Sequence, residues 1–93
     1  MVTIVIIGAG NIGSRHLQGL QTLEPPADVA VVDPAVDSLT LARERWQATG
    51  CTRHDVAYHT DLADLGIEHA DVAVIATTAR VRAAVTHQLL EQM

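Results

Sequence analysis

Runs of apolar residues alternate along the chain with segments in which apolar residues recur at helical spacing. A continuous, β-branched run is typical of a strand that is buried on both faces of a parallel sheet. The pattern predicts strong strands at Val2–Ile7, Asp28–Asp33 and Ala70–Thr77, and a short, weaker strand at Val56–Thr60.

Helices are predicted between these strands. The first, Asn11–Leu23, is expected to end before Pro25 and Pro26, because proline cannot continue a helix. Its buried side should consist of Ile12, Leu17, Leu20 and Leu23, together with Gly19.

A second helix is predicted within residues 34–50, with Asp37 or Ser38 as its N-terminal cap and Gly50 at its C-terminal end. Its buried face should be Leu39, Ala42 and Trp46. Residues 61–66 indicate one or two helical turns. A last helix, roughly Arg80–Gln92, should bury Val81, Ala84, Val85 and Leu89.

The order β-α-β-α-β-(α)-β-α predicts an α/β fold, a partial Rossmann fold with helices on both faces of a parallel sheet. Right-handed crossovers give about four strands in the order 3-2-1-4. We expect one dinucleotide-binding domain over residues 1–93 that stops before a fifth strand. The exposed edge of the fourth strand, within Asp71–Thr77, is then expected to pair with another chain and form a homo-oligomer, to be held by the rest of a larger polypeptide, or to cause aggregation.

Three glycines follow the first strand and open the first helix, as Gly8-x-Gly10-x-x-Gly13. In dinucleotide-binding folds the first glycine allows a tight turn, the second admits the pyrophosphate, and the third lets helix and strand pack closely. The N–H groups of Asn11, Ile12 and Gly13 have no intrahelical acceptor and are expected to face the phosphates. The alternative is a purely structural glycine turn.

An acidic residue at the end of the second strand supports the dinucleotide hypothesis. Asp33 lies about 20 residues beyond the glycines, where a carboxylate accepts hydrogen bonds from the adenosine ribose hydroxyls. A 2′-phosphate about 5 Å away would be repelled by on the order of 3 kcal/mol per unit charge at an effective dielectric constant of about 20. The expected cofactor is therefore NAD rather than NADP. The alternative role for Asp33 is to cap the second helix.

Composition and charge narrow the choice of partners. The net charge is −5, and every basic residue is a scattered arginine, so the chain lacks the basic patch of a nucleic-acid-binding protein. No apolar run is long enough to cross a membrane, and no signal peptide is recognisable. Cys51 is the only cysteine, which favours a free thiol and a cytoplasmic location.

The stretches VTIVIIGAGNIGSRHLQGL, VVDP, TDLADL and DVAVIATTARVR resemble, in order and spacing, the N-terminal domain of the glucose–fructose oxidoreductase/inositol dehydrogenase (Gfo/Idh/MocA) family. The resemblance extends to His16, Ala76 and Thr77. It implies that Ala76 and Thr77, at the end of the fourth strand, contact the cofactor. It implies the NAD-binding part of an oxidoreductase for a sugar or polyol hydroxyl, with a faint similarity to enzymes of bacterial surface-polysaccharide sugars.

Two departures weaken this resemblance. Thr78 and Arg82 stand where the family often has proline and histidine, and the chain contains no lysine to match the family's catalytic Glu-Lys-Pro motif. The chain alone is therefore expected to be inactive, with no catalytic residue of its own. The alternative hypothesis is a nucleotide-sensing module without chemistry, such as those that regulate ion channels.

Other polar residues are expected to be structural. A group rich in His and Asp has no compact metal-binding spacing and is interpreted as solvated surface rather than a metal site. His16 is expected on the buried side of the first helix. Arg80 and Arg82 are expected in solvent, and the alternative is that they contact an anionic ligand. The group consists of His54, Asp55, His59, Asp61, Asp64, His69 and Asp71.

Overall fold

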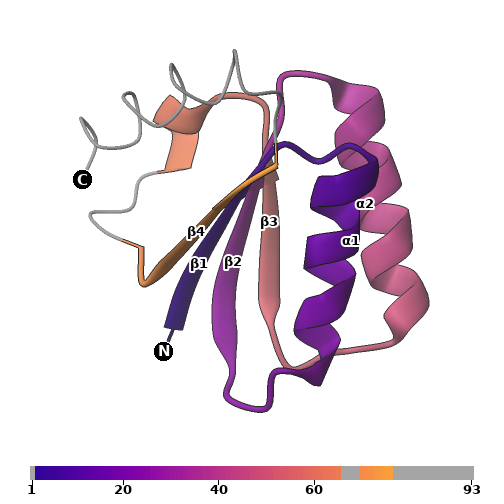
Figure 1. Ribbon diagram of the computed structural model, residues 1–93, viewed down its shortest axis with the longest axis vertical. Coiled ribbons are helices and arrows are strands. Elements are labelled where there is room, and N and C mark those ends of the chain that lie inside the picture. Colours follow the sequence, from indigo (N-terminus) through magenta and orange to yellow (C-terminus); the bar gives the residue numbers. More distant parts are fainter. Residues whose placement is uncertain (1, 66–69, 77–93) are drawn as a thin grey trace.

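The computed structural model describes residues 2–65 and 70–76. They form a four-stranded parallel sheet in the order β3-β2-β1-β4 (Figure 1). The predicted α/β class and the 3-2-1-4 strand order are confirmed. The strands are β1 (Val2–Ile7), β2 (Ala27–Val32), β3 (Asp55–His59) and β4 (Val72–Ile75).

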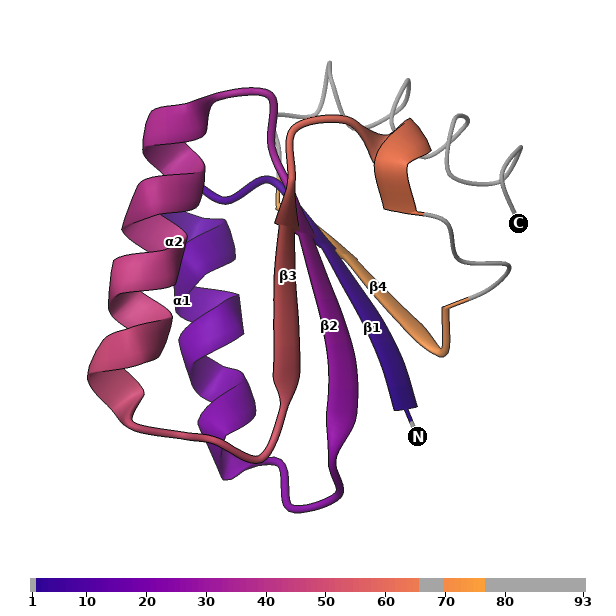
Figure 2. The same ribbon diagram turned by 180° about the vertical axis from the view of Figure 1, so that it is seen from behind.

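The two described α-helices cover the same face of the sheet (Figures 1 and 2). They are α1 (Asn11–Gly19), which continues into the 3₁₀ helix η1 (Leu20–Thr22), and α2 (Val36–Thr49). Right-handed crossovers that step twice in the same direction, from β1 to β2 to β3, require this arrangement. A second 3₁₀ helix, η2 (Leu62–Leu65), lies on the opposite side. The helix expected over residues 80–92 lies outside the described residues.

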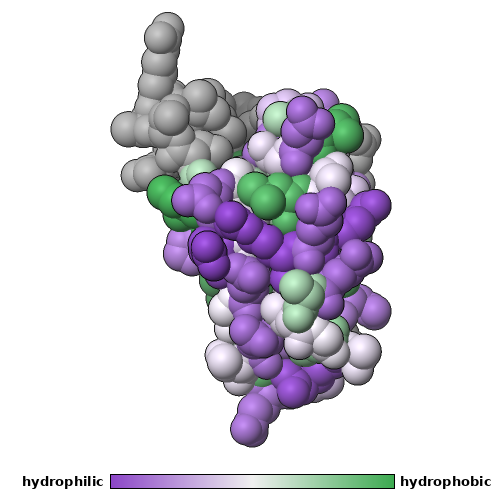
Figure 3. Space-filling view, turned by 90° about the vertical axis from the view of Figure 1, so that its right-hand side faces the viewer, coloured by the Kyte–Doolittle hydropathy of each residue, from purple (hydrophilic) through white to green (hydrophobic). Residues whose placement is uncertain are grey.

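Strand alternation divides the apolar core into two layers. The larger layer lies between the sheet and the two α-helices, and the smaller one lies on the other face, beneath η2. The larger layer contains Ile4, Ile6, Ala9, Leu17, Ala27, Val29, Val31, Leu39, Ala42 and Trp46, and the smaller contains Val5, Ile7, Val32 and Leu62. The outer surface of the α1–α2 layer is mainly hydrophilic (Figure 3).

The predicted C-terminus of α2 is confirmed, but its predicted N-terminal cap is wrong. Gly50 adopts the left-handed conformation, with φ 70°. Neither Asp37 nor Ser38 caps the helix; both lie within it, and Ala35 is the first flanking residue. The Asp33 carboxylate accepts the Ala35 N–H at 2.8 Å, and this turn allows the helix to begin at Val36.

The predicted buried face of α1 is partly wrong. Leu17 is fully buried, but Ile12 is 65% exposed, and Gly19 and His16 are also exposed. The buried residues of the helix are Gly13, Ser14 and Leu17. The close approach of Gly13 to the sheet sets the rotation of the helix, so positions 12 and 16 turn outward.

His54 is buried rather than solvated, which corrects the expectation for that residue. Its Nδ1 accepts the Ala27 N–H at 3.1 Å, and its Nε2 lies 2.9 Å from the Leu20 carbonyl oxygen. Since Nδ1 is an acceptor, Nε2 carries the proton and donates to Leu20. The ring also lies against Trp46, with centroids 6.0 Å apart. His54, which immediately precedes β3, therefore joins η1 to the start of β2 at the end of the sheet far from the glycines.

Candidate functional site

The loops that follow β1 and β2 meet at the carboxyl end of the sheet (Figure 1). The Gly8 N–H donates to the Val32 carbonyl at 2.8 Å, and the Ala9 N–H donates to Asp33 Oδ2, also at 2.8 Å. The glycine turn is thus held against the end of β2. In open parallel α/β sheets, ligands bind in the crevice at this end.

Gly8 and Gly13 are required by the fold itself. Gly8 has φ 96°, a conformation that residues with a side chain rarely adopt. A Cβ at Gly13 would collide with the carbonyl oxygen of Gly8. These two positions therefore show the tight turn and the close helix–strand packing that the sequence predicts.

Gly10 is different, because the fold does not require a glycine there. Its φ is −67°, which any residue adopts, and a Cβ at this position would meet no atom of the described chain within 4 Å. As far as the described residues are concerned, the space above Gly10 is therefore open to a ligand. This geometry fits the approach of a pyrophosphate to the backbone.

Within the described residues, the N–H groups at the start of α1 have no hydrogen-bond acceptor. No side chain caps it, and the Ser14 N–H is the first to find a backbone acceptor, the Gly10 carbonyl at 2.9 Å. The N–H groups of Asn11, Ile12 and Gly13 precede it and have no intrahelical acceptor. Together with the positive end of the helix dipole, they can bind an anion such as a phosphate.

Asp33 is half-buried beside this turn, and both of its carboxylate oxygens accept backbone N–H groups. Oδ2 accepts from Ala9 and Oδ1 from Ala35, each at 2.8 Å. A carboxylate has about four lone-pair sites, so acceptor capacity remains for two ribose hydroxyls. Asp33 does not cap α2 through the helix N-cap position, since Ala35 occupies it.

The end of β4 also reaches this turn. The Ala76 N–H donates to the Ile7 carbonyl at 2.8 Å, and the Ala76 Cβ would lie 3.6 Å from a Cβ built on Gly13. The structure thus brings Ala76 together with the glycines and Asp33. Thr77, the other predicted residue of this strand end, lies outside the described residues, as do Arg80 and Arg82.

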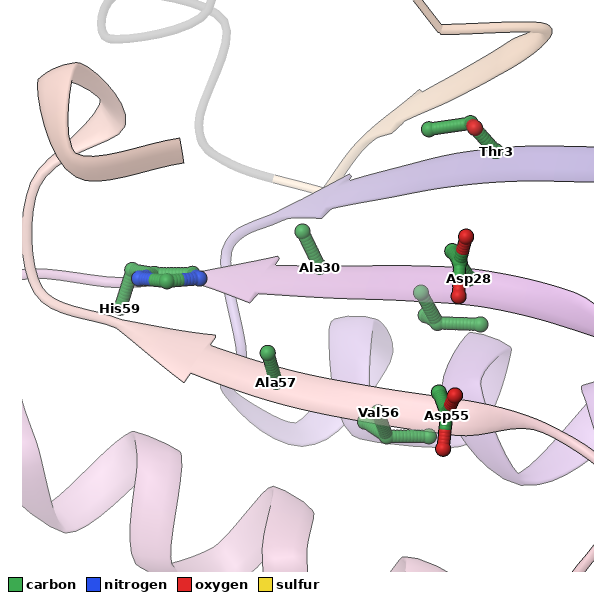
Figure 4. Close-up of a pocket in the computed structure, with 8 residues that line it drawn as sticks. Thr3, Asp28, Ala30, Asp55, Val56, Ala57 and His59 are labelled. Carbon is green, nitrogen blue, oxygen red and sulfur yellow. The ribbon is translucent and has the colours of Figure 1, made fainter. Parts of the chain in front are cut away.

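A separate hollow lies on the face of the sheet opposite α1 and α2, with a volume of about 290 Å³ (Figure 4). It contains small and acidic side chains, and Asp28 and Asp55 stand side by side on β2 and β3. Two neighbouring carboxylates disfavour a phosphate, so this hollow is not the dinucleotide site. Its lining residues are Thr3, Asp28, Val29, Ala30, Asp55, Val56, Ala57 and His59.

In the described ranges, no three His, Cys, Asp or Glu side chains come together to hold an ion. Within these same ranges, no helix has the length and apolar character needed to cross a membrane.

The TrkA-N domain family matches residues 4–93, and the chain belongs to this family. TrkA-N domains are Rossmann-like and bind NAD(H) dinucleotides, in agreement with the expected fold and class of ligand. No curated protein and no solved structure matches the chain.

Membership of the TrkA-N family overturns the resemblance to Gfo/Idh/MocA proteins and the sugar oxidoreductase that it implied. The resemblance relied mainly on the glycine turn and the strand pattern. Many Rossmann folds share both features because the same turn geometry binds the phosphates of different nucleotides. Thr78, Arg82 and the absence of lysine were departures from that family.

Proposed function

We propose that the chain is a non-catalytic dinucleotide-sensing domain that regulates potassium transport. The open space at Gly10 carries this proposal, because it lies beside the unpaired N–H groups of α1 in a TrkA-N domain. Binding alone is enough for such a role. The sensing domain acts in the cytoplasm, as the single cysteine and the lack of an apolar span suggest.

Asp33 connects ligand binding to the surrounding structure. Its carboxylate holds the glycine turn through Ala9 and the start of α2 through Ala35. Ribose hydroxyls bind the lone-pair sites of this carboxylate that Ala9 and Ala35 leave open. A ligand that also contacts the glycine turn therefore holds the two loops together more firmly, and a transport protein that contacts these loops would respond to its binding.

NAD(H) is the proposed ligand rather than NADP(H). The Asp33 carboxylate is compatible with free ribose hydroxyls and repels a 2′-phosphate. The residues that follow it, Pro34, Ala35 and Val36, provide no positive charge to offset this repulsion.

Calorimetric titration with NAD and NADH tests the proposal, with the Gly10→Val and Gly19→Val variants as a matched pair. Both glycines have open space for a side chain, but only Gly10 lies at the phosphate site. We expect Gly10→Val to fold normally by circular dichroism and to lose binding, and Gly19→Val to bind like the parent. Equal binding by parent and Gly10→Val would refute the pyrophosphate assignment.

A further inference from the structure

Arg45 of α2 lies across the start of α1, where sequence analysis gave it no role. Its Nη1 donates to Ser14 Oγ at 2.6 Å and to the Asn11 carbonyl oxygen at 3.1 Å. Ser14 is fully buried and itself donates to the Asn11 carbonyl at 3.2 Å. One guanidinium nitrogen therefore closes a three-residue network in the first turn of the phosphate-binding helix.

The network ties this turn to a neighbouring helix. A second hydrogen bond runs from α1 to α2: Gln18 Nε2, one turn further along α1, donates to the Arg45 carbonyl oxygen at 3.5 Å. The two contacts, at positions 14 and 18 of α1, fix the rotation of the helix against α2. Because Gly13 leaves no room for a side chain toward the sheet, the turn is restrained from both sides.

The charge of Arg45 is also uncompensated in the part of the chain that the structure describes. It is half-buried, and no carboxylate in that part forms an ion pair with it. Hydrogen bonds from a charged donor are about twice as strong as neutral ones. A guanidinium one turn behind the unpaired N–H groups adds positive potential at the place where an anion would bind.

We propose that Arg45 is a positioning residue for phosphate recognition. It fixes the first turn of α1 so that the N–H groups of Asn11, Ile12 and Gly13 face the pyrophosphate. This inference rests on the proposed dinucleotide site and extends it to a residue on another helix. It applies to the phosphate part of the ligand and not to the adenosine.

The experiment compares ADP with adenosine as probes in titrations followed by nuclear magnetic resonance. Arg45→Ala should weaken ADP binding about tenfold, the expected effect of losing charged hydrogen bonds, and leave adenosine binding unchanged. Arg45→Lys, which keeps the charge, should recover most of the loss. Arg43→Ala is the matched control, since it removes an arginine from the same helix that contacts Tyr58 instead of α1.

Amide exchange in the unliganded chain separates this inference from the proposed function. Arg45→Ala should speed exchange of the Ser14 and Arg15 amides more than Arg43→Ala does. Equal ADP affinity in the two alanine variants, or equal exchange, would overturn the role of Arg45. A parent chain that binds neither ADP nor NAD would overturn the proposed function, while the exchange comparison would still test the restraint.

A Ser14→Ala variant tests the same network if Arg45→Ala does not fold. It removes the shared buried hydroxyl and keeps the charge of Arg45. Weaker ADP binding with unchanged adenosine binding would support the network, and parent-like ADP binding would contradict it.

Discussion

The carboxylate of Asp33 accepts a hydrogen bond from the Ala9 N–H at 2.8 Å, across 24 residues of sequence. The acid at the end of β2 and the glycine turn after β1 are therefore one structural unit before any ligand binds. Ala9 is fully buried, so its N–H has no access to water and depends on this acceptor. Asp33 thus has a structural role in addition to its proposed contact with the ribose.

Replacement of Asp33 by alanine should reduce NAD affinity and narrow the preference for NAD over NADP. Removing the carboxylate removes both the ribose acceptor and the repulsion of a 2′-phosphate. That repulsion corresponds to on the order of a hundredfold preference. Parallel calorimetric titrations with NAD and NADP measure the difference in affinity between the two dinucleotides.

The same variant should be less stable, since the Ala9 N–H loses its partner at a cost of about 1–3 kcal/mol. Asp37→Ala is the control, because it removes an exposed carboxylate from the first turn of α2. If the ratio of NAD affinity to NADP affinity is the same in Asp33→Ala and Asp37→Ala, Asp33 does not contact the ribose.

Replacement of Gly13 by alanine should destabilise the fold. The new methyl group collides with the Gly8 carbonyl, which belongs to the backbone and cannot rotate away. Overpacking of this kind costs about 1–3 kcal/mol. Chemical denaturation measures the loss.

Gly19→Ala provides the comparison for this experiment. It lies in the same helix with open space around it, and alanine there should be neutral or stabilising by up to about 1 kcal/mol. If the two alanine variants were equally stable, α1 would not pack against the glycine turn as described.

Tyr58 should ionise only at high pH. Its hydroxyl oxygen is buried and has no hydrogen-bond partner in the described ranges. Burial raises the pKa of Tyr58 above its usual value of 10.0, and the nearby Arg43, 4.7 Å from the ring centre, partly opposes this shift. Because Tyr58 is the only tyrosine, an absorbance titration follows it alone. Arg43→Ala should raise the pKa further.

This shift makes the stability of the fold depend on alkaline pH. The folded state holds the phenol proton to a higher pH than the unfolded chain does. The contribution of protonated Tyr58 to the free energy of unfolding is therefore complete below about pH 10. It is lost as the pH rises through the pKa of Tyr58 in the folded state. Tyr58→Phe should remove this dependence and should be neutral or stabilising by up to about 1 kcal/mol. A tyrosine that titrates at or below its usual pKa would contradict the described burial.

The parts of the fold that depend on residue type alone were predictable. β-Branched runs predicted the strands, and the strand–glycine–helix pattern followed by Asp33 predicted that the glycine turn and Asp33 meet at one edge of the sheet. Gly8 and Gly13 have the roles expected of their positions, because each follows from the absence of a side chain.

The parts that depend on distant contacts were not predictable. Nothing in the local sequence shows that His54 bonds to the backbone of Ala27 and Leu20, or that Arg45 reaches Ser14. The exposure of Ile12 is likewise set by how closely Gly13 approaches the sheet, not by helical spacing. The family assignment failed for a related reason, since a shared phosphate-binding turn does not identify what a protein does.

The last prediction concerns β4, one of the two edge strands of the described sheet. Among the described strands, it pairs only with β1, and Val72 is 48% exposed. An apolar edge whose backbone groups pair with no other described strand is a template for pairing with a further strand. We therefore expect the 93-residue chain to self-associate in sedimentation measurements as its concentration rises.

A lysine on this edge should oppose strand pairing through repulsion and solvation of the charge. Val72→Lys should shift the chain toward the monomer, whereas Val36→Lys, which places the same charge at another exposed valine on α2, should not. If both variants associate as the parent does, self-association occurs elsewhere on the surface. If the parent is a monomer at every concentration, the edge of β4 does not pair with a second copy.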